Sequence, residues 1–456
     1  MSTGYNGSEN FAPGKTRYGL FPSISLGWVV SEEPWMKKVH WVDYLKLRAS
    51  LGKVGNDLGT SSRFMYMQGT WNESGSYYFG ATNTGGVPRY ELGTPGNEGV
   101  TWETALKANV GLDFELLKKR LHFGGDIFYE HRTGILVKPN SLPGVIAFTP
   151  QNMNRGEVDN RGYEVEIGWR DHVGEFSYDI NANVTFARNK IVFMDEVPSL
   201  MPYQNQTGGP TNRHLLYQYV RLYQKSDFYT DENGVQRLNP DLPQPATTVY
   251  PGDCMYADIG GALDENGNPI PDGKVDGLDK MYTGYPDRPE YIFGSNWKFN
   301  WKGFNLQLNW VAVTNVNRVW NADYRIPFTN SGHRGLLDIF AQNSWIDNDN
   351  PWAPGREDGT LPRFTKTNYP WNSEDSTLWV VDASYLRLKS ASFGYTFSRN
   401  KFFDKLGIGS VGLMFTGYNL WTLSYMTLQD PEAKSSDSHG TYPLVKTFNL
   451  ALNINF

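Results

Sequence analysis

Apolar and polar residues alternate one by one along many segments of this chain, and this period of two is what most restricts its fold. The clearest run is 176–186, where the apolar set is Phe176, Tyr178, Ile180, Ala182, Val184 and Phe186 and the residues between are Ser, Asp, Asn and Thr. Successive side chains of a β-strand point to opposite faces, so such a segment has one apolar and one polar face. Similar patterns at 43–51, 110–116, 163–169, 304–310 and 411–417 predict an all-β fold.

We predict about eleven strands, and the connections between them alternate strictly between short and long. The strands lie near residues 17–30, 43–54, 102–115, 121–134, 162–170, 175–191, 290–301, 304–317, 379–398, 410–423 and 444–456. The long connections are 55–101, 135–161, 192–289, 318–378 and 424–443. Within 385–397 the alternation changes phase, which predicts a β-bulge near Lys389–Ser390.

Alternating short and long connections are typical of an antiparallel up-and-down barrel in an outer membrane, with short periplasmic turns and long external loops. In lipid every backbone polar group needs an internal partner, so a β protein must close on itself. One strand face then meets hydrocarbon, and the other meets a wet lumen and can carry Asn, Ser or Glu. The pattern therefore predicts a transmembrane β-barrel with apolar rows facing outward.

The final strand has the same two faces. Phe448, Leu450, Leu452, Ile454 and Phe456 form its apolar row, and the residues between are three Asn and one Ala. Five apolar side chains facing lipid and an aromatic last residue are what a terminal barrel strand requires. We interpret these five residues as the barrel-assembly signal.

The first predicted strand, residues 17–30, runs inward from the external side. Complete bacterial barrels have an even number of strands and begin on the periplasmic side, so we expect further material upstream of this chain. Residues 1–16 are expected to be the tail of an external loop, and residues 17–456 part of the barrel.

The composition excludes several classes of protein. The 456 residues carry a formal net charge of −6 and a single cysteine, Cys254. No basic stripe is present for nucleic acid, and one cysteine allows neither an internal disulfide nor a cysteine metal cluster. The start lacks the apolar stretch of a signal peptide, and no run of about 18 apolar residues occurs. These features alone would indicate a soluble cytoplasmic protein, which the strand pattern contradicts.

Several longer motifs resemble one family. They include "FAPGKTRYGLFPSISLGWVVSEEPWM", "LKLRASLGKVGN", "WETALKANVGLDF", "RGEVDNRGYEVEIGW", "YTGYPDRPEYIFG", "WVVDASYLRLKSASFGYTFS", "TGYNLWTLSYMTLQDPE" and "YPLVKTFNLALNINF". Together they resemble SusC/RagA-type TonB-dependent transporters, the nutrient importers of Bacteroidota outer membranes. The resemblance implies a barrel of about 22 strands, of which this chain matches the C-terminal half. The signal peptide, TonB box and plug domain of that family have no counterpart here.

The resemblance also implies partners and cargo. These are a SusD-like surface lipoprotein as a lid, TonB–ExbB–ExbD acting through the missing N-terminal part, the barrel-assembly machinery, outer-membrane lipid, and an oligosaccharide or peptide cargo. No cofactor and no nucleic acid are expected.

Aromatic residues gather in the long loops, where they could stack on sugar rings or pack on peptide side chains. The candidates for cargo binding are Trp71, Tyr77, Tyr78, Trp320, Tyr324, Trp345, Trp352 and Trp371. Packing of each loop on itself is the alternative for any one of them. The loop 192–289 has about twice as many acidic as basic residues, which fits either a partner-binding mouth or a solvated surface.

A weak candidate for a metal site lies at 263–279, "LDENGNPIPDGKVDGLD". Asp264, Asn266 and Asn268 could supply oxygens at alternate positions, as in a calcium loop. Pro269 and Val275 stand where that loop needs glycine and glutamate, and a pair of tight turns is the simpler interpretation. The expected metal content is none.

No catalytic constellation is found, so we expect no enzyme activity. Glu164 and Glu166 could sit at the spacing of glycosidase carboxylates, but two lumen-facing residues on one strand are the simpler explanation. A soluble all-β carbohydrate-binding or glycan-degrading protein remains the alternative function. An adhesin or passive pore would share the same barrel physics.

Overall fold

The computed structural model describes residues 1–14, 16–57, 63–67, 69, 71–82, 84–142, 150–328, 335–365, 369–398, 405, 407–434 and 442–456. The chain divides into two compact units. The first comprises Met1–Val197, Gln206–Thr211 and Phe293–Lys302, and the second Pro198–Asn205, Asn212–Ile292 and Gly303–Phe456. Within the described residues, no helix has the length and apolar character needed to cross a membrane.

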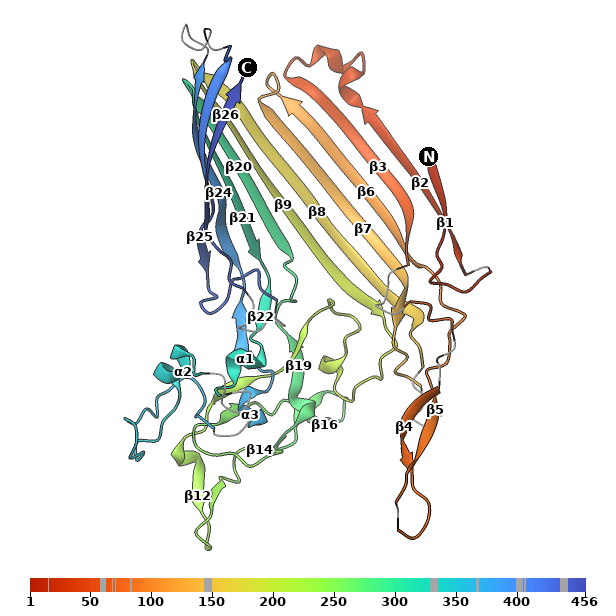
Figure 1. Ribbon diagram of the computed structural model, residues 1–456, viewed down its shortest axis with the longest axis vertical. Coiled ribbons are helices and arrows are strands. Elements are labelled where there is room, and N and C mark those ends of the chain that lie inside the picture. Colours follow the sequence, from red (N-terminus) through yellow and green to blue (C-terminus); the bar gives the residue numbers. More distant parts are fainter. Residues whose placement is uncertain are drawn as a thin grey trace. The chain divides into compact units, whose positions relative to one another are not determined.

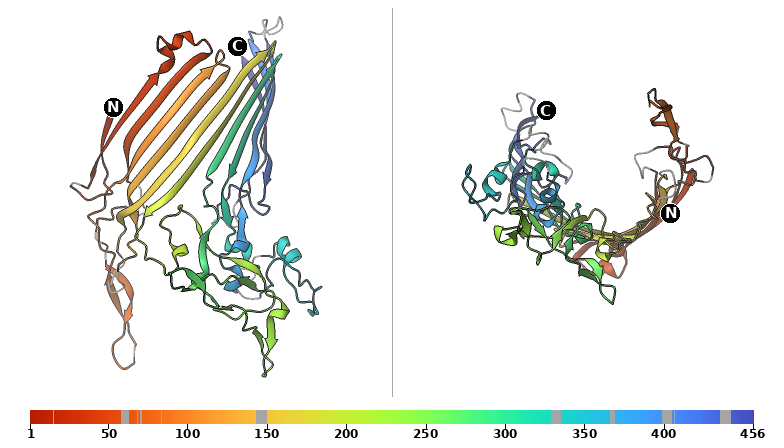
Figure 2. Two further views of the ribbon diagram at one scale, coloured as in Figure 1. Left: turned by 180° about the vertical axis from the view of Figure 1, so that it is seen from behind. Right: turned by 90° about the horizontal axis from the view of Figure 1, so that it is seen from below.

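The first unit contains an antiparallel sheet whose long strands follow one another up and down (Figure 1). Seen from behind, the same strands lie side by side in the same order (Figure 2). In sheet order they are β1 Ser2–Gly7, β2 Tyr18–Val29, β3 Val42–Asn56, β6 Glu103–Leu116, β7 Leu121–Val137, β8 Met153–Val173, β9 Phe176–Phe193 and β20 Tyr291–Trp301.

Strand β1 corrects the expectation that residues 1–16 are only the tail of a loop. Its residues Ser2–Gly7 pair antiparallel with Tyr18–Ser23 of β2, and Tyr5 stacks on Tyr18 with ring centroids 5.4 Å apart. The sequence STGYNG gave no strand signal because Gly and Asn have low β propensity and only one large apolar residue is present. The strand is formed by its pairing with β2 rather than by its own pattern.

Strand β8 is also longer than expected. Its 21 residues begin at Met153, nine residues before the predicted start at 162. The added residues, MNRGEVDNR, are mostly polar and show no apolar alternation, but they pair with β7 and β9. A strand can extend beyond its apolar residues as long as its backbone forms hydrogen bonds with the neighbouring strands.

The connections of the first unit include one projecting hairpin and one folded turn. The hairpin consists of β4 Trp71–Tyr77 and β5 Val87–Leu92, and the turn after β2 contains the 3₁₀ helices η1 Val30–Glu32 and η2 Met36–Lys38. Near the loop ends, Phe11, Met65 and Val100 form a small buried cluster with Trp102 and Leu136.

The second unit supplies four long strands, β21 Phe304–Thr314, β24 Tyr385–Ser398, β25 Ser410–Ser424 and β26 Thr447–Asn455. The units thus hold twelve long strands, one more than predicted, because β1 was not foreseen. The predicted bulge is confirmed: the register of β24 shifts between Leu388 and Ser390 against β25, and opposite Asn309 and Trp310 against β21.

The long loops of the second unit fold into a body of short elements. They are η3 Pro202–Gln204, β10 His214–Tyr217, β11 Tyr219–Leu222, η4 Lys225–Asp227, β12 Phe228–Thr230, β13 Gln236–Leu238, β14 Gln244–Pro245, β15 Cys254–Tyr256, β16 Gly261–Leu263, β17 Pro269–Pro271, β18 Lys274–Val275, η5 Gly277–Asp279, β19 Lys280–Thr283, β22 Asn317–Val319, α1 Ala322–Arg325, α2 Asp338–Asn343, α3 Pro370–Ser373, η6 Thr377–Trp379 and β23 Val380–Asp382. We call this the loop body. Two buried apolar clusters hold it together, centred on Tyr256 and on Trp379.

Candidate functional site

The strands of the first unit carry apolar and polar rows on opposite faces. One row across six strands, β2 to β9, consists of Leu26, Ala49, Val110, Ile127, Tyr163 and Phe186. The next row in register consists of Gly27, Arg48, Gly111, Asp126, Glu164 and Thr185. Consecutive residues of a strand point to opposite faces, so these rows lie on opposite sides of the sheet.

No second layer formed by the described residues covers the apolar row. Val110 is 62% exposed and Ile127 70% exposed. On β26 of the second unit, Leu450 and Leu452 are 72% and 62% exposed. A soluble sandwich would bury such residues between two sheets, so these faces require an apolar surrounding such as lipid.

Arg48 joins three strands on the polar face. Its Nε and Nη2 donate to the Asp113 carboxylate at 2.7 and 2.9 Å, and its Nη1 and Nη2 donate to Asp126 at 3.0 and 2.9 Å. A Cβ on Gly111 would come within 2.5 Å of Asp126 Oδ1 and 2.8 Å of the Arg48 guanidinium carbon. Because Gly111 has no side chain, the Arg48 guanidinium has enough space to bind both carboxylates.

In the loop body, the buried carboxylate of Asp253 connects two long loops. Asp253 has no exposed surface, accepts from Arg363 Nε at 2.6 Å and Nη2 at 3.3 Å, and accepts from Asn372 Nδ2 at 2.8 Å. It also accepts from the backbone N–H of Tyr250 at 2.8 Å. Arg363 in turn lies over the rings of Tyr250 and Tyr369. The arrangement fixes the loop 192–289 to the loop 318–378.

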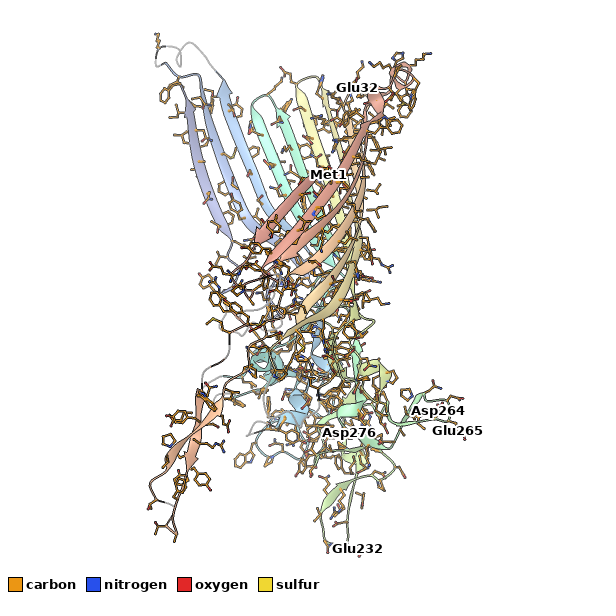
Figure 3. All side chains as sticks on the ribbon, turned by 90° about the vertical axis from the view of Figure 1, so that its right-hand side faces the viewer. Met1, Glu32, Glu232, Asp264, Glu265 and Asp276 are labelled. Atoms are coloured by element: carbon orange, nitrogen blue, oxygen red, sulfur yellow. The ribbon has the colours of Figure 1, made fainter. Side chains whose placement is uncertain are left out.

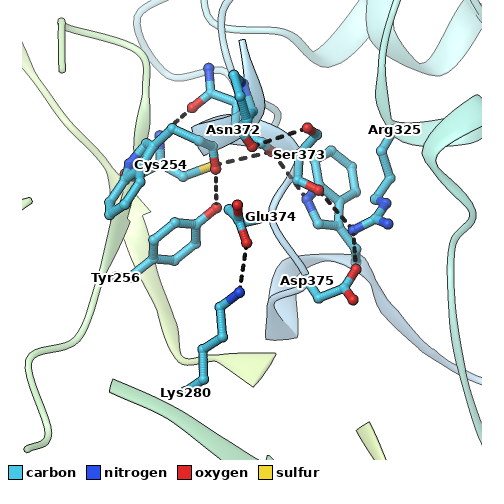
Figure 4. A network of polar contacts seen from close by, with 11 residues as sticks. Cys254, Tyr256, Lys280, Arg325, Asn372, Ser373, Glu374 and Asp375 are labelled. Atoms are coloured by element: carbon cyan, nitrogen blue, oxygen red, sulfur yellow. Dashed lines mark hydrogen bonds and ion pairs between the residues drawn. The ribbon is translucent and has the colours of Figure 1, made fainter. Parts of the chain in front are cut away.

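The residues next to Asp253 form a second set of buried contacts (Figure 4). Tyr256 donates its hydroxyl to the Trp371 carbonyl at 2.6 Å, and Trp371 Nε1 donates to the Cys254 carbonyl at 2.8 Å. Burial raises the pKa of the Cys254 thiol well above its usual range. The single cysteine is therefore a protonated core residue.

Among the predicted cargo contacts, three are core residues. Trp345 and Trp371 are 5% and 6% exposed within the cluster centred on Tyr256, and Tyr324 is 8% exposed. Trp320 is partly buried against the cluster centred on Trp379. The three core rings are too enclosed to offer a face to a sugar or a peptide, so the alternative of loop packing describes these three better.

The other four predicted aromatics are exposed. Trp71, Tyr77 and Tyr78 of the β4–β5 hairpin region are 66%, 59% and 55% exposed, and Trp352 is 92% exposed. The ring of Tyr77 lies against that of Phe79, with ring centroids 4.8 Å apart, and Tyr77 remains mostly exposed. These rings are available to a ligand or partner.

The segment that carries Trp352 is held by one lysine. Lys225 Nζ lies 2.7 Å from Asp347, 2.6 Å from Asp349 and 2.9 Å from Glu357. These ion pairs raise the pKa of the Lys225 ammonium, and the ammonium lowers the pKa of Asp347. The clasp fixes both ends of the turn whose tip is Trp352.

The weak metal candidate folds as a turn. The Asp264 carboxylate accepts the backbone N–H of Asn266 at 2.9 Å, the backbone N–H of Asn268 at 2.7 Å and Asn268 Nδ2 at 3.0 Å. Asp264 stands at the outer end of the β16–β17 hairpin (Figure 3). In the described part of the chain, no group of three His, Cys, Asp or Glu side chains is arranged to hold a metal ion.

Sequence reasoning missed the buried ionic contacts. Besides Asp253, Arg387 of β24 is 1% exposed and binds Asp430 at 2.6 Å and Glu432 at 2.9 Å. Tyr385 donates its hydroxyl to the same Glu432 oxygen at 2.8 Å. The only available signal was a charged residue in the apolar-polar strand pattern, followed about 40 residues later by the acidic QDPE segment.

The exposed apolar rows and the long antiparallel strands described above are those of a membrane barrel wall, and comparison with known proteins agrees on this fold. Residues 2–315 match the family model described as TonB dependent receptor-like, beta-barrel. The chain belongs to the TonB-dependent receptors. Its fold is thus the predicted all-β antiparallel barrel fold, and its location is the cell outer membrane.

Curated relatives place this TonB-dependent receptor chain beside SusC. It is 28% identical to TonB-dependent receptor P3 of Formosa agariphila over 99% of this chain and 43% of that protein. It is 26% identical to TonB-dependent receptor SusC of Bacteroides thetaiotaomicron, over 99% of this chain and 41% of that protein. The chain thus spans less than half the length of the curated relatives it matches.

Among solved structures, the RagAB peptide transporter has the same fold. The TM-score is 0.73 at 17% identity, over 99% of this chain and 45% of that one. The predicted SusC/RagA relationship is confirmed by these matches. Its relatives are receptors and transporters, which supports the expectation, at the level of the family, that this receptor is not an enzyme.

Proposed function

We propose that this chain is part of an outer-membrane importer that takes up oligosaccharides or peptides. Its strands form part of the barrel wall, a SusD-like lipoprotein closes the outer mouth, and TonB–ExbB–ExbD supplies energy through a region outside this chain. The observation that carries the proposal is the exposed apolar row beside a polar row of hydrogen-bonded charges, in a chain of this family.

The proposal assigns functions to the loops and the last strand. Residues 55–101, 135–161, 192–289, 318–378 and 424–443 would be external. Of these, residues 58–62, 68, 70, 83, 143–149, 329–334, 366–368 and 435–441 lie outside the described part. The exposed rings of Trp71, Tyr77, Tyr78 and Trp352 would contact cargo or partner. The outward row Phe448, Leu450, Leu452, Ile454 and Phe456 would be read by the barrel-assembly machinery and then face lipid.

The test is growth and uptake in the native host. Deleting the coding region of this chain should abolish growth on one class of cargo, either an oligosaccharide or a peptide mixture, while growth on the monomers continues. The protein should remain in the membrane after a carbonate wash. Unchanged growth on every cargo together with a soluble protein would contradict the proposal.

Energy dependence separates the importer from a passive pore. Uptake of a labelled cargo should stop when a protonophore collapses the inner-membrane gradient that drives TonB. Uptake that continues at the same rate would identify a pore. Glycan cleavage by the purified chain would instead support the soluble or glycan-degrading alternative.

A further inference from the structure

An apolar groove lies on the exposed apolar face of the first unit. It has a volume of about 620 Å³ and is lined by residues of strands β3, β6, β7, β8 and β9. Val110, Ile127, Tyr163 and Phe186 of the apolar row described above line it. The groove therefore lies on the apolar face of the sheet and not on the polar face.

Two acidic residues border the groove, but their side chains belong to the other face. Asp126 accepts hydrogen bonds from Arg48 on the polar face, and Glu164 lies in the same polar row. Consecutive residues of a strand point to opposite faces. Among the described lining residues, no carboxylate therefore points into the groove.

The hollow centres on Gly125, which lies on the apolar face of β7 between Phe123 and Ile127. It is directly opposite Leu112 of β6 and Val165 of β8. All four of these neighbours carry large apolar side chains, whereas the glycine carries none. The missing side chain leaves a depression that the four neighbours surround.

The length of the groove matches one leaflet of a membrane. Strand β7 lines it from Phe123 to Phe128, which is about 17 Å along the strand. Barrel strands are tilted by about 35–45°, so this length covers about 13 Å of depth. The hydrocarbon core is about 30 Å thick, so one leaflet is about 15 Å thick. An acyl chain in one leaflet therefore has the reach to lie along the whole groove.

Two arginines lie at one end of the groove. Arg161 is the first residue of β8 to line it, so this end is the one nearer the long β7–β8 connection. Arg188 of β9 is directly opposite Arg161 in register, and its guanidinium carbon lies 5.6 Å from the ring centroid of Phe186, which also lines the groove. Arg161 is exposed and, within the described part of the chain, forms no hydrogen bond or ion pair with another side chain.

The two arginines leave a place for an anion. Like charges directly opposite each other on one face of a sheet destabilise it. The next residue of β8 on this face is Asp159, but it is directly opposite Lys190, and its carboxylate lies 2.7 Å from His131 Nδ1. This carboxylate is therefore already engaged by other basic residues and does not neutralise both arginines.

We propose that this groove binds one anionic membrane lipid, with an acyl chain in the hollow at Gly125 and the phosphate group between Arg161 and Arg188. The guanidinium group binds phosphate through two N–H groups in a fixed fork. The apolar and cationic parts are continuous, because Gly125 and Arg161 line the same groove. An apolar surface of another protein would leave the Arg161 charge without a counterion, so the charge favours a phosphate-bearing lipid.

This inference goes beyond the proposed import function, because it concerns the outward face of the sheet and not the path of the cargo. The two can fail separately. Loss of uptake with the lipid still bound would remove only the import proposal. Equal retention of all lipids by a receptor that imports cargo would remove only the lipid site.

The experiment uses the receptor purified from its native outer membrane in a mild detergent, and native mass spectrometry counts the lipids that it retains. Phosphatidic acid and phosphatidylcholine with the same acyl chains are added in equal amounts, so that only the headgroup differs. The receptor should retain phosphatidic acid at least about fivefold more strongly, because each arginine near a membrane surface contributes about this factor for an anionic lipid. Equal retention of the two lipids would overturn the proposal.

Variants of the groove locate the site. Arg161→Gln should weaken the binding of phosphatidic acid about fivefold and leave that of phosphatidylcholine unchanged. Gly125→Val fills the hollow, and it should weaken the binding of both lipids about fourfold for each methylene that it displaces. An unfolding midpoint in urea equal to that of the wild type, measured in lipid vesicles, shows that each variant is folded.

Lys53→Gln is the matched control. Lys53 lies on the same face of β3 as the groove residue Leu47, but three strands away from Arg161 and outside the groove. This separation is about 14 Å and exceeds the Debye length of about 10 Å at 0.1 M salt, so the change should alter lipid binding less than about twofold. Equal effects of Lys53→Gln and Arg161→Gln, or no effect of Gly125→Val, would overturn the proposal. A receptor dimer that Gly125→Val dissociates would assign the groove to a second copy of the chain and would also overturn it.

Discussion

The buried carboxylate of Asp253 should control the opening of the loop body, and Asp253→Asn tests this. The side chain accepts four hydrogen bonds, two of them from the Arg363 guanidinium. The asparagine keeps the shape but removes the charge and turns an NH₂ group toward donors. Hydrogen bonds to charged groups contribute about 1.5–3 kcal/mol, and loss of one member of a buried pair costs about 3–5 kcal/mol. Arg363 is 26% exposed, so water replaces part of the loss, and we expect about 2–3 kcal/mol.

Cys254 makes this opening measurable, because it is the only cysteine and is fully buried. Alkylation by a maleimide reports the fraction of molecules in which the loop body is open. A cost of about 2–3 kcal/mol corresponds to alkylation about 30- to 150-fold faster in Asp253→Asn than in the wild type. Asp349→Asn is the matched control, since Asp349 is 87% exposed and Lys225 retains two other carboxylates. It should change the rate less than about twofold. Equal rates in the wild type and Asp253→Asn would refute the reasoning.

Three further predictions concern other contacts. Arg387→Met should destabilise the segment after β25 by about 2–3 kcal/mol, because Asp430 and Glu432 lose a buried partner. Hydrogen exchange in residues 424–434 measures this loss of stability. Exchange rates equal to those of the wild type would contradict the prediction. The ion pairs of Lys225 should stabilise the segment that carries Trp352 between two limits of pH. The pKa of Asp347 is lowered in the folded protein, so its stabilising contribution is present above the unfolded pKa of 3.8 and is lost as the pH falls through the folded pKa. The pKa of Lys225 is raised, so its contribution is present below the unfolded pKa of 10.5 and is lost as the pH rises through the folded pKa. The hydrogen-exchange protection factors of residues 344–361, which are corrected for the intrinsic pH dependence of amide exchange, should therefore fall at both extremes and stay constant between pH 5 and pH 9. A change in these protection factors within that window would count against the clasp. Ile127→Arg, on the exposed apolar row, should destabilise the chain in lipid by about 2–4 kcal/mol, whereas Glu164→Gln on the polar row should not. Urea unfolding in lipid vesicles measures this. Equal unfolding midpoints for the two variants would show that the apolar row does not face lipid.

The long strands could be predicted because one face of a membrane strand meets lipid and the other meets water, so apolar and polar residues alternate along its sequence. Strands β6 and β9 match the predicted ranges within two residues, and the phase change near Ser390 located a true bulge. Prediction failed where pairing rather than burial forms the strand. Residues Ser2–Gly7 and the polar start of β8 are strands because a neighbour supplies hydrogen bonds, and their own side chains give no sign of it.

Only half of the aromatic residues predicted to bind cargo are exposed, and the reason for this failure differs from that for the strands. Trp345 and Trp371 were as good cargo candidates as Trp352 by sequence, because a tryptophan in a long loop can serve a core or a surface equally well. Which of them is buried depends on contacts between loops more than 100 residues apart, such as that between Cys254 and Asn372, whose separation is 118. No local pattern carries this information, and the same holds for the partners of Asp253.

In the proposed importer, the polar face of the first unit would line the path of the cargo, and its charged residues are paired in a way that would avoid retaining the cargo. Arg48 is held by Asp113 and Asp126, and Lys107 lies 3.2 Å from Glu130. Transport requires that binding be weak enough for the solute to leave, and a bare charge in a confined space would hold an oppositely charged solute. Because these charges satisfy one another across strands, they keep the wall wet and the strands in register without offering a strong fixed site. Specific recognition would then be left to the loops, where exposed rings such as those of Trp71 and Trp352 are found.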